Sequence, residues 1–117
     1  MWKKEKNLYF SRVKLFIMHS QIIKTIESNI HHFGFSNLVD FAANQAKMFT
    51  LSKIEEYRNI TRYFEDKYKM SYRKFEAIIN KSKKNENFDK EDDLMEWRFA
   101  EESVMLYKKE LKSLQKC

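Results

Sequence analysis

The stretch that decides the fold runs from Ser11 to Phe49 and is SRVKLFIMHSQIIKTIESNIHHFGFSNLVDFAANQAKMF. In its first part Val13, Leu15 and Ile17 fall on every second position, which is the spacing of a strand with one buried face. From Ser20, a suitable N-cap, the apolar residues instead recur at the spacing of a helix; they are Ile22, Ile23, Ile26, Ile30 and Phe33. The stretch therefore predicts a strand at residues 12–17 followed by a helix.

The chain's only glycine, Gly34, is predicted to end this helix. A helix C-terminus favours a residue that tolerates a positive φ, and glycine does so without strain. Ser36 is then expected to cap a second helix. The inward positions of that helix would be Leu38, Phe41, Ala42, Gln45 and Met48 or Phe49. The predicted order is strand, helix, turn and helix.

This order of elements resembles the ribbon-helix-helix family of DNA-binding proteins, and the resemblance covers residues 11–49. In that family two copies of the strand form an antiparallel ribbon in the DNA major groove, and such pairing would satisfy the backbone of a lone strand. The resemblance implies a homodimer that buries Val13, Leu15 and Ile17 and that binds operator DNA. The candidate DNA-binding residues are Lys3, Lys4, Arg12, Lys14, Phe16, Ser36 and Asn37.

The charges are unevenly distributed along the chain. Residues 1–80 hold 14 Lys and Arg against 8 Asp and Glu, whereas residues 81–117 hold 9 of each. The first 24 residues carry a net charge of +5. A basic arm that leads into a basic strand suits phosphate contacts, although it also suits a merely solubilising N-terminus. Residues 86–102 carry a net charge of −6, which suits a basic partner.

The composition favours helices. The chain has 117 residues, 43% of them hydrophobic, with one glycine and no proline. We expect a mainly α protein with a short N-terminal strand and about five helices. Residues 1–50 would form a ribbon-helix-helix dimerisation and DNA-binding region, and residues 51–117 a helical partner-binding extension. A lone cysteine, Cys117, and the absence of long apolar runs favour the cytoplasm.

No catalytic or metal-binding pattern stands out. The adjacent His31 and His32 would point about 100° apart on a helix, so they cannot easily share one ion. The sequence has no glycine-rich phosphate loop and no nucleophile elbow. We expect no enzyme activity, no metal and no cofactor.

The second half of the chain predicts further helices. A helical pattern continues from Leu51 to Tyr68. Ser52 and Glu55 match a capping box, so we favour a bend or short break between Met48 and Ser52, although nothing in that stretch forbids a continuous helix. Ser71 begins another helix, where Met70 and Phe75 can form a hydrophobic staple. Residues 81–87 form a polar connection that we expect to be mobile. The last helix carries a heptad seam, made of Trp97, Ala100, Val104, Tyr107, Leu111 and Leu114 and widened by Leu94, Phe99 and Leu106.

A second resemblance covers roughly residues 53–114. The run Phe64-Glu65-Asp66-Lys67-Tyr68-Lys69-Met70-Ser71 with Phe75, followed by Asp93-Leu94-Met95-Glu96-Trp97, Leu106 and Leu111, resembles a pattern in small antitoxin-like proteins encoded beside toxins. The family pattern has a glycine where this chain has Lys69. The resemblance implies that the C-terminal helices bind a co-encoded toxin of ribonuclease-like type. The candidate partner-binding residues are Tyr68, Phe75, Asp93, Leu94, Glu96, Trp97 and Phe99, whereas Leu111 and Leu114 are expected in the protein's own core. For Trp97 the seam spacing alone favours the core instead, and the resemblance favours the partner.

Together the two resemblances imply an antitoxin that binds operator DNA through its N-terminal ribbon and neutralises a toxin through its C-terminal helices. The alternative keeps the fold without the DNA: a helical dimerisation and protein-interaction module.

Overall fold

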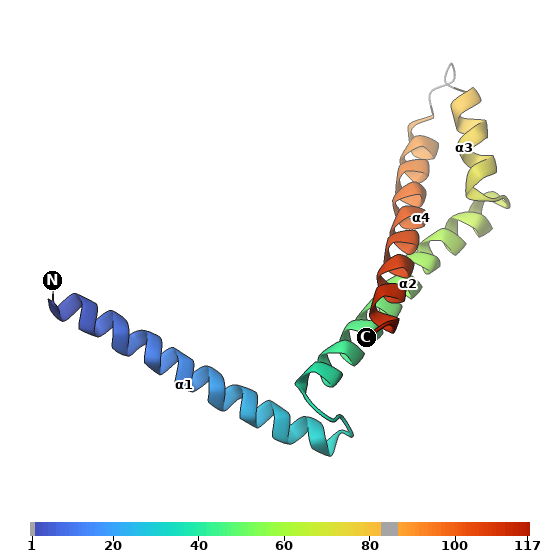
Figure 1. The fold of residues 1–117 in the computed structure, drawn as a ribbon. Coiled ribbons are helices and arrows are strands. Elements are labelled where there is room, and N and C mark those ends of the chain that lie inside the picture. The colour runs from blue at the N-terminus through green and yellow to red at the C-terminus, as the bar shows by residue number, and fades with distance from the viewer. Residues whose placement is uncertain (1, 83–86) are drawn as a thin grey trace. The chain divides into compact units, whose positions relative to one another are not determined.

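Four helices make up the part of the chain that the computed structural model describes, which is residues 2–82 and 87–117, with side chains described from residue 7. The helices are α1 (Trp2–His32), α2 (Leu38–Tyr68), α3 (Tyr72–Lys81) and α4 (Phe88–Gln115) (Figure 1). The chain divides into two units, Met1–Asn44 and Gln45–Cys117. Helix α2 therefore belongs to both units, and the boundary expected after residue 50 falls inside it.

The predicted strand at residues 12–17 is wrong, and with it the ribbon-helix-helix fold. These residues lie in the middle of α1, and none of the residues described is in a strand. A helix satisfies its backbone N–H and C=O groups within its own segment, whereas a lone strand leaves them without partners. No glycine or proline interrupts the chain between Trp2 and His32. Ser20 consequently lies inside α1 and does not cap it.

The break expected between Met48 and Ser52 is also absent, since α2 continues from Leu38 to Tyr68. Within this region the buried Thr50 hydroxyl donates to the Ala46 carbonyl at 2.7 Å, as is common within helices. A capping serine starts a helix only where the preceding residues leave the helical conformation, and nothing in this sequence forces them to. The described chain therefore has four helices and not the expected five.

Gly34 ends α1 as predicted, with a φ of 93°. The Phe35 N–H donates to the Ile30 carbonyl at 3.0 Å and the Gly34 N–H donates to the His31 carbonyl at 3.1 Å, which is a Schellman motif. Ile30 is only 2% exposed, and Phe35 lies edge-to-face with Phe41 at 5.2 Å between ring centroids. The turn thus builds a small apolar contact of its own.

The side chain that caps α2 is Asn37, one residue later than predicted. The Asn37 Oδ1 accepts from the Asp40 N–H at 2.8 Å, and the Asp40 carboxylate accepts from the Ser36 N–H at 3.0 Å. These bonds satisfy N–H groups that the first helical turn leaves free.

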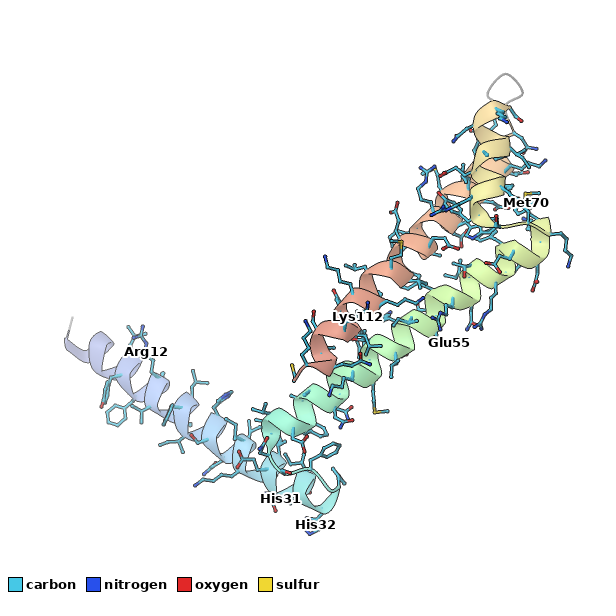
Figure 2. All side chains as sticks on the ribbon, turned by 45° about the vertical axis from the view of Figure 1, so that its right-hand side comes forward. Arg12, His31, His32, Glu55, Met70 and Lys112 are labelled. Carbon is cyan, nitrogen blue, oxygen red and sulfur yellow. The ribbon has the colours of Figure 1, made fainter. Side chains whose placement is uncertain are left out.

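The turn between α2 and α3 follows the prediction more closely. The Ser71 hydroxyl accepts from the Lys74 N–H at 3.3 Å and caps α3, as expected. Met70, labelled in Figure 2, packs on the apolar cluster that contains Phe75. Lys69 has a φ of 54°. Glycine adopts a positive φ without strain, whereas lysine does so at a cost.

Helices α2, α3 and α4 pack around Trp97, whose exposed fraction is 0%. Its indole lies 5.6 Å from the Phe64 ring, 5.4 Å from Phe75 and 5.7 Å from Tyr72, measured between centroids. Tyr68 adds a stacked ring at 6.3 Å. Aromatic rings at these separations attract one another beyond simple area burial, so this cluster is the core of the second unit.

Helix α4 runs beside α2 in the opposite direction (Figure 1), with Tyr107 stacked on Tyr57 at 6.0 Å. The heptad seam predicted for the last helix is confirmed. Its first three residues, Trp97, Ala100 and Val104, are buried, and its last three, Tyr107, Leu111 and Leu114, are half-buried. Asn87 caps α4 by accepting from the Lys90 N–H at 3.3 Å. Of the connection expected to be mobile, residues 83–86 lie outside the described residues.

Candidate protein-interaction surface

Two polar networks fasten α4 to the helices before it. In the first, Asp93 accepts hydrogen bonds from the Tyr68 hydroxyl and, at 2.7 Å, from the Lys67 ammonium group. Burial alone would raise the pKa of Asp93, but the bonds from Lys67 and Tyr68 outweigh burial and hold that pKa below its usual value. Burial, followed by the bond to Asp93, raises the pKa of Tyr68. Asp93 is therefore a carboxylate that joins the end of α2 to the first turns of α4.

The second network joins α3 to α4. The Tyr72 hydroxyl donates to Glu76 at 2.5 Å and accepts from the Arg98 Nε at 3.0 Å, while a second Arg98 nitrogen donates to Glu76 at 3.2 Å. The bond from Tyr72 is the largest effect that lowers the pKa of Glu76, and Arg98 lowers it further. The hydrogen bonds among these three side chains hold α3 against α4.

This packing corrects most of the expected partner-binding set. Trp97 is fully buried, Phe75 and Leu94 are buried, and Tyr68 and Asp93 are half-buried in the networks just described. The first three fill the protein's own core, and the Tyr68 hydroxyl and Asp93 carboxylate are hydrogen-bonded within the protein. Only two expected partner-binding residues lie at the surface: Glu96 and Phe99, the latter 59% exposed.

Phe99 belongs to a second apolar face of α4, which we call the α4 outer face. It consists of Phe88, Met95, Phe99 and Leu106, with exposed fractions of 68%, 66%, 59% and 54%. Their spacing of seven, four and seven residues places them on one side of the helix, roughly opposite Trp97. Phe99 also lies edge-to-face with Tyr57 of α2, at 5.8 Å between ring centroids, so its predicted widening of the core seam holds in part, whereas Leu106 is 54% exposed.

The α4 outer face has an acidic border. Four acidic side chains and one basic side chain lie within about 60° of the centre line of this face, measured around the helix axis. The acids are Glu91, Asp92, Glu102 and Glu110, and the base is Lys109. Asp92, Glu102 and Glu110 are exposed. An apolar strip with acids along its edges is complementary to an apolar strip with Lys or Arg along its edges.

No protein family, curated protein or solved structure matches this chain. What the α4 outer face binds must therefore be inferred from its own chemistry.

The expected DNA-binding residues do not form one surface. On a helix Arg12, labelled in Figure 2, and Lys14 point about 200° apart. Both are exposed on α1, as is Phe16. Ser36 and Asn37 serve the cap of α2. Lys3 and Lys4 lie in α1, but their side chains are outside the described part. The base-reading face that a ribbon would present is thus dispersed.

The two adjacent histidines lie exposed in the last turn of α1 (Figure 2), where partial positive charge is favourable. The His32 Nδ1 lies 2.9 Å from the Ser28 carbonyl oxygen. Within residues 7–82 and 87–117, no three His, Cys, Asp or Glu side chains gather as a metal site would require. The described helices also include none with the length and apolarity needed to cross a bilayer.

Proposed function

We propose that this chain is a helical protein-interaction module that binds a basic protein partner through the α4 outer face. The observation that carries the proposal is a row of four apolar side chains, each more than half exposed, on a helix whose opposite face is core. Fully burying one such side chain contributes about 1.5–3 kcal/mol. A partner that covers the row therefore gains favourable binding free energy from each of the four side chains. An apolar centre with a polar rim is the usual anatomy of a protein interface.

The acidic border specifies the chemistry of the partner. Residues 88–106 hold seven acids and two bases. Arg98 is engaged with Glu76 and Tyr72, and Asp93 with Lys67 and Tyr68, which leaves six acids and one base. Like charges that face each other across an interface are unfavourable, and opposite charges accelerate association. The partner should therefore present an apolar ridge flanked by Lys or Arg, most simply on an amphipathic helix.

A second, more specific form of this proposal is neutralisation of a co-encoded toxin. The residues that carry the antitoxin-like resemblance, from Phe64 to Trp97, pack together as the platform that holds the α4 outer face outward. A ribonuclease-like toxin fits as the basic partner, because proteins that contact RNA phosphates carry basic surfaces. Operator DNA is not part of the proposal, since residues 12–17 lie in α1 and form no ribbon.

The test uses three aspartate variants of the full chain. Met95→Asp and Leu106→Asp place a charge at the centre of the α4 outer face, whereas Met48→Asp places it on α2 at a residue of similar exposure, 60% against 66% for Met95. Binding to the purified product of the adjacent reading frame is measured by calorimetry. Loss of a central side chain costs about 2 kcal/mol or more, so each α4 variant should bind at least about thirtyfold more weakly.

The Met48→Asp control should bind within about twofold of the wild type, since single surface changes away from an interface have small effects. Equal weakening by all three variants would contradict the proposal, and a wild type that does not bind the adjacent product would contradict its toxin form. The toxin form requires in addition that the wild type, and not Met95→Asp, restores growth of cells that express that product.

A further inference from the structure

Helix α1 exposes a long apolar face that the proposed function does not use. Five apolar residues fall on it, with exposed fractions from 37% to 68%; they are Leu8, Leu15, Ile22, Ile26 and Phe33, the last directly after the helix end. Their spacing of seven, seven, four and seven residues is that of a heptad seam. Arg12, His19 and Asn29 occupy the remaining seam positions. We call all eight residues the α1 seam.

We propose that the α1 seam packs side by side, in antiparallel direction, against the α1 seam of a second copy of the chain. A helix of 31 residues is about 46 Å long, and the seam extends over most of that length. The occupant must therefore be an equally long apolar surface. A second α1 supplies one, and a two-fold axis through the middle of the seam, between Ser20 and Gln21, makes the surface self-complementary.

The register of the seam selects the antiparallel direction. When Leu15 lies opposite Ile26 of the second copy, Leu8 lies opposite its Phe33. In the same register Arg12 lies opposite Asn29 of the second copy, whose side-chain carbonyl can accept from the guanidinium group. A polar pair at a seam position commonly fixes register and orientation in such helix pairs.

Parallel pairing is disfavoured by charge. It would place Arg12 directly against Arg12 of the second copy at a seam position, which is repulsive. Residues 7–20 contain two bases and no acid, whereas residues 21–32 contain one base, Lys24, and one acid, Glu27. Antiparallel pairing sets the basic half beside the neutral half. The α4 outer face would pack less well against the α1 seam. At heptad spacing its contact positions include Asp92 and Glu102, which would place two carboxylates against an apolar surface.

The first test measures mass in solution for the wild type and two matched variants. Leu15 and Ile17 are both more than half exposed, at 65% and 51%, but they point about 200° apart on α1. The wild type at tens of micromolar should have twice the single-chain mass of 14.4 kDa. Leu15→Asp should be monomeric with unchanged helicity by circular dichroism, and Ile17→Asp should remain dimeric. A monomeric wild type, or equal loss of the dimer in both variants, would overturn the pairing.

The second test fixes the direction by disulfide formation, in a Cys117→Ser background. In the antiparallel register a Leu15→Cys chain meets an Ile26→Cys chain, so a mixture of the two should give the mixed disulfide. Each variant alone should not cross-link, since two copies of residue 15 would be about 16 Å apart along the axis and a disulfide needs Cα atoms within about 7 Å. Efficient cross-linking of Leu15→Cys with itself would establish parallel pairing and refute the antiparallel register.

Discussion

Replacing Trp97 by Ala tests directly whether the conspicuous tryptophan of α4 belongs to the core or to a partner surface. The side chain is 0% exposed and lies within 6.3 Å, between ring centroids, of four other aromatic rings. Its removal leaves a cavity among rings that belong to two other helices, α2 and α3, so no single element can move to fill it. Truncation of a buried Trp to Ala costs about 3–5 kcal/mol.

That cost is large against the whole free energy of unfolding, which is about 5–15 kcal/mol for a domain of ordinary stability. The assay is urea denaturation followed by far-ultraviolet circular dichroism, with the midpoint and the slope compared between variants. A matched control is Met95→Ala, because Met95 lies on the same helix, two residues away, and is 66% exposed. The control should change stability by about 0.5 kcal/mol or less. If Trp97→Ala shifts the midpoint no more than Met95→Ala does, the assignment of Trp97 to the core is refuted.

Three further predictions concern single residues. Lys69→Gly should stabilise the protein by about 0.5–1 kcal/mol, because relief of the left-handed backbone, about 1–2 kcal/mol, exceeds the entropic cost of glycine, about 0.4–1 kcal/mol; a lower urea midpoint would contradict it. Asp93→Asn should destabilise the protein at neutral pH, and the difference in unfolding free energy from the wild type should narrow below about pH 4, since the lowered pKa of folded Asp93 stabilises above the unfolded pKa and that benefit is lost as the pH falls; denaturation across pH measures this difference, which should stay constant from about pH 6 to pH 9 and narrow again above about pH 10, because the bond to Asp93 raises the pKa of Lys67 and is lost when Lys67 loses its proton. Gly34→Ala should destabilise the α1–α2 turn by about 1 kcal/mol through its positive φ alone, because nothing lies within 4 Å of an added Cβ; unchanged thermal loss of helicity would argue against this.

Helix ends that depend on the backbone conformation or capping side chain of a single residue were predicted well from the sequence. Gly34 and Ser71 sit where a helix end and a helix start need them, and both assignments are confirmed. The seam of the last helix was also predictable, since Trp97, Ala100 and Val104 repeat over consecutive turns. The prediction of a strand at residues 12–17 was wrong because the run is mostly apolar. Its apolar residues match the two-residue period of a strand and also the 3.6-residue period of a helix, and only a partner strand could have favoured the sheet.

The candidate site was harder to predict than the fold. Tyr68, Phe75, Asp93 and Trp97 are large or charged residues, which we interpreted as a partner surface. Their burial results from the crossing of α2, α3 and α4, and no pattern within a single helix reveals that crossing. A consistent seam argument would have placed Trp97 in the core with Ala100, and would have left Met95 and Leu106 as the exposed row.

The continuity of α2 has a consequence for how the protein opens. One helix, Leu38–Tyr68, is shared by both units, so its backbone hydrogen bonds need not all have the same lifetime. Amides from Thr50 to Phe64 lie in the turns that hold the buried residues of α2, whereas those from Leu38 to Asn44 belong to the other unit. Amides held by tertiary packing exchange their hydrogens more slowly than those of frayed turns. A hydrogen-exchange profile along α2 should therefore step from fast to slow near Gln45, within a helix that has no break.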